Sequence, residues 1–313
     1  MIAYGFSEYG GPGTEHVLDI PIADPGQGQL LVAVHAAGVN PADWKVRSGL
    51  RKDVAPVTLP AVLGREVSGT VVQVGVHADG FSVGDRVFGA TATGHGGYAQ
   101  YTVLDAAETA HKPDDVSFAA AATLPVAAGT AADALDLLGL RKEDTLLVLG
   151  AGGGVGSTAL QLARADGIAV IGVASARKRE LVESLGGVFV ESGENFVERI
   201  AADVDAVFKV DAVFKVDAVF DLVGGDTLRR AAESVAAGTP IVSVADPVLA
   251  GSLGGSGVRR DRSSAAFARL AELVGTGVLQ PRIEHVYPLD RAGEALALVE
   301  EGHATGKVVI AVE

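Results

Sequence analysis

The segment TLLVLGAGGGVGSTALQLARADG, Thr145–Gly167, decides the fold of the region around it. Leu146–Leu149 is an apolar run, and a cluster of glycines follows it directly. Apolar residues then recur at helical spacing, at Val155, Ala159, Leu160, Leu162 and Ala163. A second apolar run, Ile168–Ala174, is typical of another buried strand. The segment therefore predicts a strand, a tight turn, a helix and a second strand.

The glycine cluster occupies the turn between the predicted strand and helix. Glycine permits a sharp turn, lets a pyrophosphate approach bare backbone, and lets the helix pack close to the strand. A glycine-rich turn without a ligand is the alternative, but five glycines between residues 150 and 156 would lose much backbone entropy on folding. The pattern predicts a dinucleotide site. Its expected binding residues are Gly150, Gly153, Gly154, Val155 and Gly156.

The end of the second predicted strand indicates which dinucleotide binds. An NAD site usually places an acidic residue there for the ribose 2′-hydroxyl. This chain has Ser175, Arg177 and Lys178 instead, and Glu180 already belongs to the following helix. Cations that only decorated a helix start would be disfavoured by the helix dipole, whereas a 2′-phosphate would bind both cations and the hydroxyl. The cofactor predicted from these residues is NADPH.

Composition limits the classes of protein to consider. The chain has 313 residues, of which 48% are hydrophobic, which is enough for two domains. Its net charge of −14 argues against nucleic acid and anionic membranes as partners. With no cysteine, the chain can form neither disulfides nor a thiolate-ligated zinc site. The first residues lack a signal peptide pattern, and glycine or charge interrupts the apolar runs before they reach a membrane span, so we expect a cytoplasmic protein.

Short apolar runs separated by turn residues make residues 1–112 β-rich, and they predict a small, partly open barrel. Helical patterns begin near Val116 and lead into the nucleotide-binding segment, with an interruption at Pro125. Asp205–Val210 and Asp211–Val216 are identical DAVFKV copies, and DAVFDL follows them. Only the third copy precedes a glycine turn, so Ala218–Val223 is predicted to be the central strand and Asp205–Val216 an added excursion. At that turn, Val223 and Gly224 should meet the cofactor.

Several stretches of this chain, which follow one another in the order found in the family, resemble the zinc-free branch of the medium-chain dehydrogenase/reductase superfamily. This branch contains NADPH:quinone oxidoreductases, zeta-crystallin and related enone reductases. The resemblance covers nearly the whole chain. The stretches that carry it are VHAAGVNPADWKVRSG, LPAVLGREVSGTVVQVG, FSVGDRVFG, GGYAQYTV, AATLPVAAGTAADAL, LGAGGGVGSTALQLA and DAVFDLVGG.

The resemblance implies an α/β fold in which a Rossmann nucleotide-binding domain is inserted into a GroES-like, partly open β-barrel catalytic domain. We expect the first part of the catalytic domain at residues 1–116, the NADP-binding domain at 117–262, and the return to the catalytic domain at 263–313. The active site would lie in the cleft between the domains. The sequence does not decide between a monomer and a homodimer.

Zinc-bearing relatives carry a cysteine in the motif that corresponds to Asn40–Asp43 and a histidine before Glu66. This chain has Asn-Pro-Ala-Asp and Arg65 at these places. We therefore predict no metal, and carbonyl polarisation by hydrogen-bond donors. Without a metal, Glu66 is expected to pair with Arg65 or another arginine.

The resemblance also implies individual site residues. Asn40 would lie near the nicotinamide, Thr130 would contact it, and Lys45 would face the substrate carbonyl and stabilise the enolate that hydride addition forms. The alternatives are a turn-forming Asn40, a helix-turn hydroxyl at Thr130 and a solvated Lys45. Asp43 is expected to be a cap or ion-pair residue, and Tyr98 a core aromatic rather than a lining residue.

These observations predict a zinc-independent, NADPH-dependent oxidoreductase that reduces quinones or α,β-unsaturated carbonyls. One alternative is an enoyl-thioester reductase, with Arg259, Arg260 and Arg262 as a phosphate-binding patch. The other is an NADPH-binding structural or sensor protein with little turnover. The substrate itself has no recognisable sequence signature.

Overall fold

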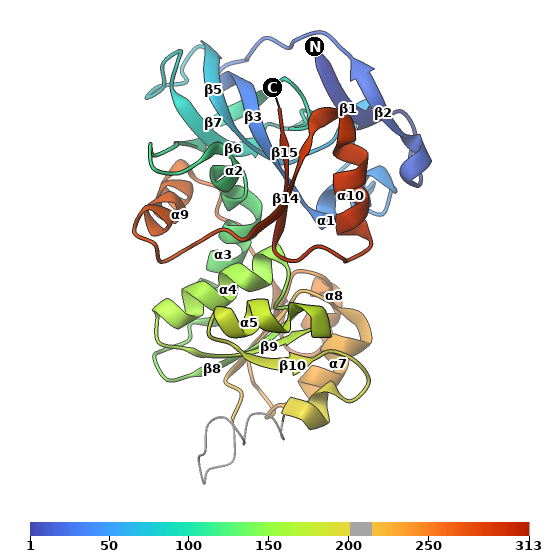
Figure 1. Ribbon diagram of the computed structural model, residues 1–313, viewed down its shortest axis with the longest axis vertical. Coiled ribbons are helices and arrows are strands. Elements are labelled where there is room, and N and C mark those ends of the chain that lie inside the picture. The colour runs from blue at the N-terminus through green and yellow to red at the C-terminus, as the bar shows by residue number, and fades with distance from the viewer. Residues whose placement is uncertain (201–214, 313) are drawn as a thin grey trace. The chain divides into compact units, whose positions relative to one another are not determined.

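The computed structural model of the chain describes residues 1–200 and 215–312. The chain divides into two compact units (Figure 1). Unit 1 comprises residues Met1–Gly129, Arg262–Gly277 and Ile283–Glu313, and unit 2 comprises Thr130–Asp261 and Val278–Arg282. The first and last parts of the sequence therefore fold together, with a second unit inserted between them.

A barrel of antiparallel strands forms the centre of unit 1. Its strands are β3 (Gln29–Val39), β5 (Glu66–Val74), β6 (Arg86–Thr91) and β7 (Tyr101–His111). Each pairs with the next, and β7 pairs back with β3, which closes the barrel. The C-terminal strands β15 (Lys307–Ala311) and β14 (Ile283–Pro288) extend the sheet from the other edge of β3. A separate three-stranded sheet has the order β2 (Glu15–Asp19), β1 (Ile2–Phe6), β4 (Ala61–Val62).

Helices of unit 1 cover this framework. They are α1 (Pro41–Arg47), α2 (Phe118–Ala121), the π-helix η2 (Leu124–Ala128), α9 (Ser264–Gly275) and α10 (Ala292–Glu300), with short 3₁₀ turns η1 (Pro12–Thr14) and η4 (Leu289–Arg291). The largest apolar cluster of unit 1 joins barrel residues such as Val32 and Val67 to Leu296 of α10 and Ile310 of β15. The core of unit 1 thus depends on the C-terminal return.

Unit 2 is built on a parallel sheet with the order β10-β9-β8-β11-β12-β13. The strands are β8 (Thr145–Leu149), β9 (Ala169–Ala174), β10 (Val188–Glu191), β11 (Ala218–Asp221), β12 (Ile241–Ser243) and β13 (Ser256–Gly257). Counted from β8, this is the 3-2-1-4-5-6 order of a Rossmann fold. The predicted strand, turn, helix and strand at Thr145–Ala174 are confirmed, and β11 lies between β8 and β12 as the predicted central strand.

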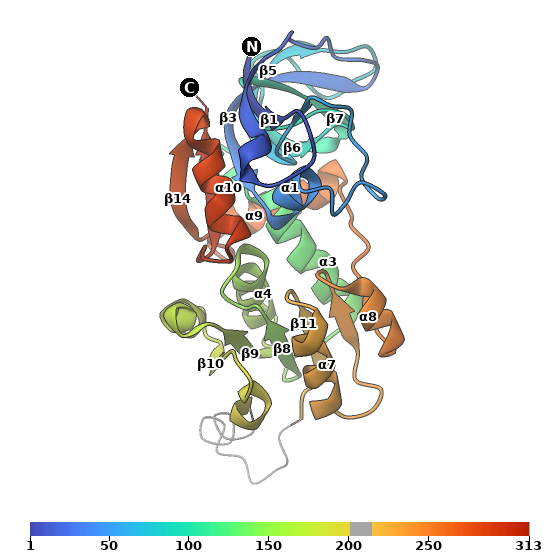
Figure 2. The ribbon, with the colours of Figure 1, turned by 90° about the vertical axis from the view of Figure 1, so that its right-hand side faces the viewer.

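Helices of unit 2 connect these strands. They are α3 (Gly129–Leu138), α4 (Gly154–Ala165), η3 (Ala176–Lys178), α5 (Arg179–Ser184), α7 (Gly225–Ser234) and α8 (Pro247–Ser252), and residues 196–200 are also helical. Figure 2 shows α4 and α5 beside β8, β9 and β10, and α7 beside β11, while α8 packs against β12 and β13. Every residue of β8 is buried, as expected for a central strand that is covered on both faces.

The structure moves the first domain boundary. We predicted it at residue 116, but residues up to Gly129 belong to unit 1. The reason is packing of the segment against the barrel: Ser68 Oγ on β5 donates to the Phe118 carbonyl at 2.6 Å, and the Val126 amide donates to Glu66 Oε2 at 2.7 Å. Helical patterning reveals that this segment is helical but not which sheet it covers.

The DAVFKV repeat of Asp205–Val216 lies outside the described residues except at its last two positions. One described helical segment, Phe118–Leu138, is long and apolar enough to cross a membrane by length and composition, contrary to the prediction that no run reaches a span. Within that segment 61% of the most apolar window is buried in the protein, as in the core helix of a folded domain.

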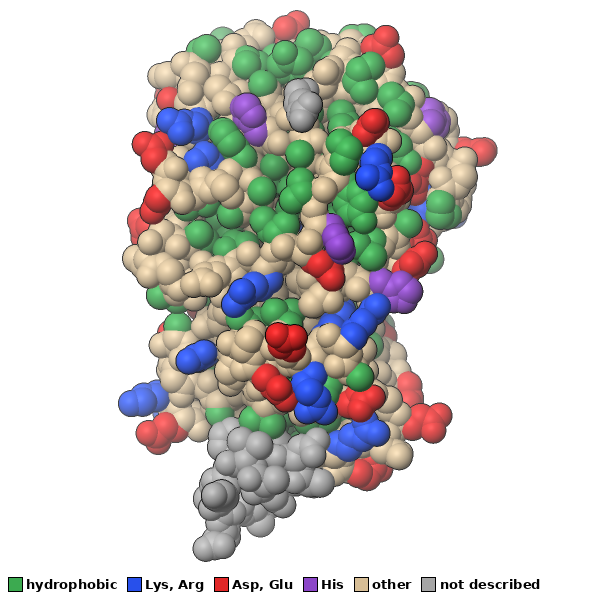
Figure 3. All heavy atoms as spheres, in the orientation of Figure 1, with side chains coloured by type: hydrophobic (Ala, Val, Ile, Leu, Met, Phe, Trp, Pro, Cys, Tyr) green, Lys and Arg blue, Asp and Glu red, His purple; other side chains and the backbone are tan. Residues whose placement is uncertain are grey.

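On the face shown in Figure 3, acidic and basic side chains are interspersed over unit 2. This face therefore does not show the clustered basic patch that is typical of nucleic-acid-binding proteins, and the net charge of the chain is −14.

Candidate functional site

The glycine turn after β8 is shaped for a close ligand. Gly150 has φ +86°, a left-handed conformation that favours glycine, and the Gly150 and Ala151 amides both donate to the Val173 carbonyl at the end of β9. Gly153 precedes the first turn of α4 in an extended conformation. The first amides of an α-helix lack intrahelical acceptors and attract anions. The turn at the carboxyl end of β8 therefore brings together the predicted residues Gly150, Gly153, Gly154, Val155 and Gly156.

Gly156 allows α4 to lie against this turn. A Cβ atom at Gly156 would lie 2.5 Å from the Gly150 oxygen and 2.6 Å from Ala151 Cα. On the neighbouring strand, a Cβ at Gly172 would lie 2.7 Å from Val182 and 2.9 Å from Ala151. The helix and strand approach closely only because these positions have no side chain.

The segment after β9 places its basic residues beside the glycine turn. Ser175 precedes η3, whose three residues include Arg177 and Lys178. A Cβ at Gly152 would lie within 3.0 Å of the Cβ, Cγ and Cδ atoms of Lys178, so the aliphatic stem of this lysine covers the turn. Glu180 lies in α5, as predicted. The structure thus brings the predicted 2′-phosphate residues and the predicted pyrophosphate loop together.

A buried carboxylate shapes the turn after β11. Asp221 Oδ1 accepts hydrogen bonds from the Val223 and Gly224 amides at 3.0 and 2.9 Å, and Oδ2 accepts one from Ser243 Oγ at 2.6 Å. Gly224 has φ +80°, and Val223 is half exposed. The predicted cofactor residues of this turn are therefore held at the carboxyl ends of β11 and β12, where open α/β sheets bind ligands.

Thr130, the first residue of unit 2, is buried on α3. Arg260 Nη1 donates to Thr130 Oγ1 at 2.7 Å, and Arg260 Nε contacts Asp133 Oδ2 at 2.7 Å. The Asp261 amide also donates to Asp133. Arg260 is thus tied to a carboxylate, which weakens its assignment to a phosphate-binding patch. Arg262 in unit 1 similarly lies 3.9 Å from Glu108 Oε2.

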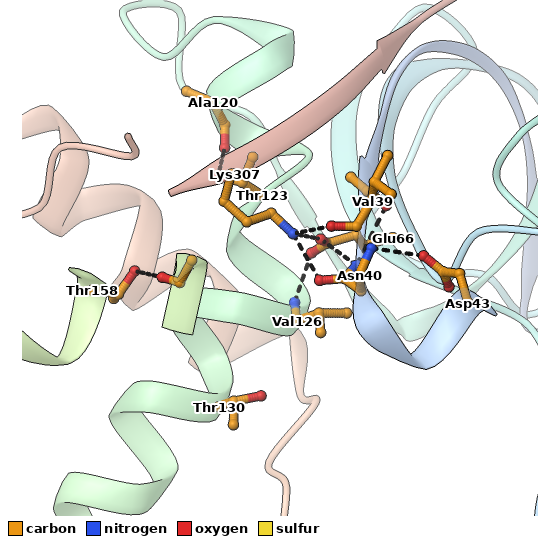
Figure 4. A network of polar contacts seen from close by, with 12 residues as sticks. Val39, Asn40, Asp43, Glu66, Ala120, Thr123, Val126, Thr130, Thr158 and Lys307 are labelled. Atoms are coloured by element: carbon orange, nitrogen blue, oxygen red, sulfur yellow. Dashed lines mark hydrogen bonds and ion pairs between the residues drawn. The ribbon is translucent and has the colours of Figure 1, made fainter. Parts of the chain in front are cut away.

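Unit 1 contains a buried polar cluster around the ammonium of Lys307 (Figure 4). Lys307 Nζ donates to the Val39 carbonyl at 3.0 Å, to Asn40 Oδ1 at 2.7 Å and to Glu66 Oε1 at 2.8 Å. The sequence predicted an arginine partner for Glu66, whereas the structure pairs it with Lys307. The antiparallel register of Val308 with Val39 places the start of β15 beside the end of β3, which explains this pairing.

The side-chain amide of Asn40 is engaged inside unit 1. Its Nδ2 donates to Glu66 Oε1 at 2.8 Å and to the Gly38 carbonyl at 3.3 Å, and its Oδ1 accepts from Lys307. Asn40 is 4% exposed. This geometry favours a role in orientation over direct donation to substrate. The predicted cofactor contact of Asn40 stays a prediction.

Asp43 caps α1, as predicted. Its Oδ2 accepts hydrogen bonds from the backbone amide of Asn40 and from Tyr98 Oη, both at 2.8 Å. Burial raises the pKa of Asp43 to about 6, while the hydrogen bonds from Tyr98 and Asn40 oppose the rise. Tyr98 is fully buried, so the core interpretation of this residue is correct. The start of α1 is therefore fixed by the buried Asp43 carboxylate, which the Asn40 backbone amide and the Tyr98 hydroxyl both contact.

Lys45 lies near the middle of α1 and is half buried, with Nζ 5.6 Å from the centroid of the Trp44 ring. In the described part of the chain, no carboxylate lies within ion-pair distance of it. A lysine that keeps its charge unpaired beside an aromatic ring can serve a developing anion.

Sequence reasoning missed two residues that hold the site, Asp221 and Lys307, and it named Arg260 only as part of a phosphate-binding patch, not as the partner of Thr130 and Asp133. A charge at the end of an otherwise apolar strand, as in AVFD and KVVIA, is the signal that could have identified Asp221 and Lys307. No comparable signal marks Arg260, because its neighbours are also basic.

Comparison with known proteins identifies relatives of the whole chain. Residues 26–114 match the family described as Alcohol dehydrogenase GroES-like domain, and residues 196–310 match Zinc-binding dehydrogenase. The chain is 31% identical to a chloroplastic quinone oxidoreductase of Triphysaria versicolor, covering 99% of this chain and 98% of that protein. It is 32% identical to a 2-methylene-furan-3-one reductase of Solanum lycopersicum, covering 99% and 79%. A mycobacterial structure described as complexed with NADPH superposes with a TM-score of 0.86 at 31% identity, covering 99% of each chain.

The residues of unit 1 do not fit the zinc ion in the second family's description. The chain has no cysteine, and Asn40 and Glu66 already surround an ammonium group that would repel a metal cation. Within the described ranges, no three His, Asp or Glu side chains are grouped to hold a metal.

The matched domains, the full-length relatives and the order of the parallel sheet agree with one another. The chain belongs to the medium-chain dehydrogenase/reductase superfamily, in the branch of the quinone oxidoreductases and enone reductases.

Proposed function

We propose that this protein is an NADPH-dependent, zinc-independent reductase of quinones or α,β-unsaturated carbonyls. The observation that carries the proposal is the convergence, in unit 2, of the glycine turn and the Ser175–Lys178 segment, with Lys178 packed over Gly152. A dinucleotide with a 2′-phosphate satisfies both features. The relatives named quinone oxidoreductase and 2-methylene-furan-3-one reductase support the substrate class.

Different residues of unit 2 would bind different parts of the cofactor. The amides at the start of α4 would bind the pyrophosphate, and Ser175, Arg177 and Lys178 would bind the 2′-phosphate. Thr130 and the Val223–Gly224 turn would orient the nicotinamide end. The bound cofactor supplies the hydride.

In unit 1, Lys45 would stabilise the charge that forms on the substrate oxygen. Hydride addition to a quinone or to the β-carbon of an enone places negative charge on a carbonyl oxygen, which a nearby ammonium can stabilise and later protonate. No zinc ion is needed for this step, because the ammonium provides the positive charge.

Lys45→Ala is expected to lower kcat more than it raises KM, because the interaction strengthens in the transition state. The loss should be about 2–4 kcal/mol of transition-state stabilisation. Steady-state kinetics of the variant and of Lys52→Ala, an exposed lysine on the following segment, check this. An unchanged kcat for Lys45→Ala would make Lys45 a surface residue.

The cofactor assignment is tested by replacing Arg177 and Lys178 together with alanine. Each charge-assisted hydrogen bond is worth about 1.5–3 kcal/mol, so the double variant should bind NADPH at least about tenfold more weakly and NADH almost unchanged. Fluorescence titration gives both dissociation constants. Arg179→Ala is the control, because Arg179 pairs with Glu183 on the same helix. Equal affinity of the parent for NADH and NADPH would contradict the assignment.

The substrate class is tested by NADPH oxidation with a panel of quinones, enones and enoyl thioesters. We expect turnover with the first two groups. The pairing of Arg260 with Asp133 and of Arg262 with Glu108 leaves little support for a thioester phosphate patch. Tight NADPH binding without turnover of any acceptor would favour the structural or sensor alternative.

A further inference from the structure

Lys307 lies on the last strand of the chain, and the proposed reaction gives it no direct part. We propose that Lys307 is a positioning residue of the reductase: together with Glu66, it fixes the Asn40 amide and thereby the start of α1, which carries Lys45. The inference rests on the proposed function, since Asn40 and Lys45 are predicted contacts of cofactor and substrate.

The ammonium of Lys307 has no capacity left for a substrate. Its three N–H groups match three acceptors at 2.7–3.0 Å, namely Asn40 Oδ1, Glu66 Oε1 and the Val39 carbonyl (Figure 4). The exposed fraction is 6% for Lys307, 4% for Asn40 and 0% for Glu66. Any effect of Lys307 on the reaction must therefore pass through its neighbours.

The charges of Lys307 and Glu66 permit only one orientation of the Asn40 amide. The amide oxygen faces the ammonium, and the amide nitrogen faces the carboxylate. A flipped amide would place N–H groups against the ammonium and an oxygen against the carboxylate. Gly38 makes room for this arrangement, because a Cβ there would lie 2.2 Å from Glu66 Oε1.

The fixed Asn40 determines where α1 begins. Asn40 is the residue before the helix, and its backbone amide donates to Asp43 Oδ2. The helix has only seven residues, and Asn40 holds its start while the ion pairs of Arg47 with Glu15 and Glu300 hold its end. Trp44, the single tryptophan of the chain, lies on α1 next to Lys45 and reports on the position of this helix.

The test is Lys307→Met, with Lys112→Met as the matched control. Lys112 is a second lysine of unit 1 with 6% exposure, and its ammonium donates to the Pro113 and Val116 carbonyls, neither of which belongs to α1. Both variants should lower the melting temperature. Only Lys307→Met should shift the Trp44 emission to longer wavelength and increase acrylamide quenching in the protein without cofactor. It should also lower kcat/KM roughly 10- to 100-fold per folded molecule.

Two further variants cover the case in which Lys307→Met does not fold. Glu66→Gln combined with Lys307→Gln leaves no unpaired buried charge, so it should fold yet show the altered Trp44 emission and the lower kcat/KM. Lys307→Arg keeps the positive charge and should recover part of the parental Trp44 emission and part of the parental kcat/KM. Parental Trp44 emission, NADPH affinity and kcat/KM in the folded double variant would overturn the proposal. If the parent enzyme reduces no acceptor, the proposed function fails, whereas the Trp44 measurement still shows whether Lys307 positions α1.

Discussion

Gly156→Ala is expected to weaken NADPH binding roughly 100-fold, the largest effect on affinity that a single methyl group should have in this chain. The new Cβ would lie 2.5 Å from the Gly150 oxygen and 2.6 Å from Ala151 Cα, and both of these are backbone atoms that no rotamer change can move away. Either α4 or the turn must shift, so the amides at the helix start would lose their alignment with the pyrophosphate. Titration of NADPH into the purified variant measures the change.

Gly251→Ala is the control for this prediction. Gly251 lies on α8 in the same unit, is exposed, and has no atom within 4 Å of an added Cβ. Circular dichroism should show that both variants keep their secondary structure. If Gly156→Ala binds NADPH as tightly as Gly251→Ala does, the turn after β8 is not the phosphate site.

Arg47→Met is expected to destabilise the protein by about 3–5 kcal/mol, the largest stability effect we predict. Arg47, at the end of α1, is fully buried, its Nε lies 2.9 Å from Glu15 Oε1, and its Nη2 contacts Glu300 Oε2 on α10. The side chain of Glu15 is only 3% exposed. Removing the guanidinium therefore leaves a buried carboxylate without its cation. Chemical denaturation of the parent and the variant measures the difference.

Two controls separate this effect from the loss of any arginine. Arg291→Met removes an ion pair with Glu294 in which both side chains are more than half exposed, so we expect no measurable change. Arg47→Met combined with Glu15→Gln should recover most of the loss, because no unpaired charge stays buried. A single variant Arg47→Met with parental stability would show that the buried pair contributes nothing.

The pH dependence of Arg47→Met has a defined sign. Burial already raises the pKa of Glu15 above its ordinary 4.5, and Arg47 opposes that rise. Without Arg47 the folded pKa rises further, so the folded state binds a proton that the unfolded state has released. The destabilisation is then fully present above the raised folded pKa, and it decreases as pH falls toward the unfolded value.

Local patterns in the sequence were sufficient to predict the central strands of the parallel sheet in unit 2 and the turns that follow them. The strand, glycine turn, helix and strand at Thr145–Ala174 are consecutive, so each residue's role follows from its near neighbours. The same holds for β11 as the central strand, whereas the phosphate-binding role of the segment from Ser175 to Lys178 stays a prediction. Asp43 was also predictable, because a cap acts within a few residues of its own helix.

The partners of Glu66 and the extent of unit 1 were not predictable in this way. Glu66 was assigned an arginine, and residues 117–129 were assigned to the nucleotide-binding domain. Both errors concern contacts between segments far apart in the chain: Lys307 is 241 positions from Glu66, and Val126 is 60. Strand periodicity shows that a residue is buried, but it does not show which distant residue lies opposite.

The sequence by itself determined the Rossmann fold and the absence of thiolate ligands for zinc, and it predicted the phosphate turn and the 2′-phosphate site, because all of these depend on residue types at short spacing. Only the tertiary structure decided that Lys307 fills the centre of the polar cluster, that Lys178 covers Gly152, and that Arg47 joins α1 to Glu15 and Glu300. The physical reason is that strand register and helix packing bring these groups together, and both are set by the burial of whole apolar faces.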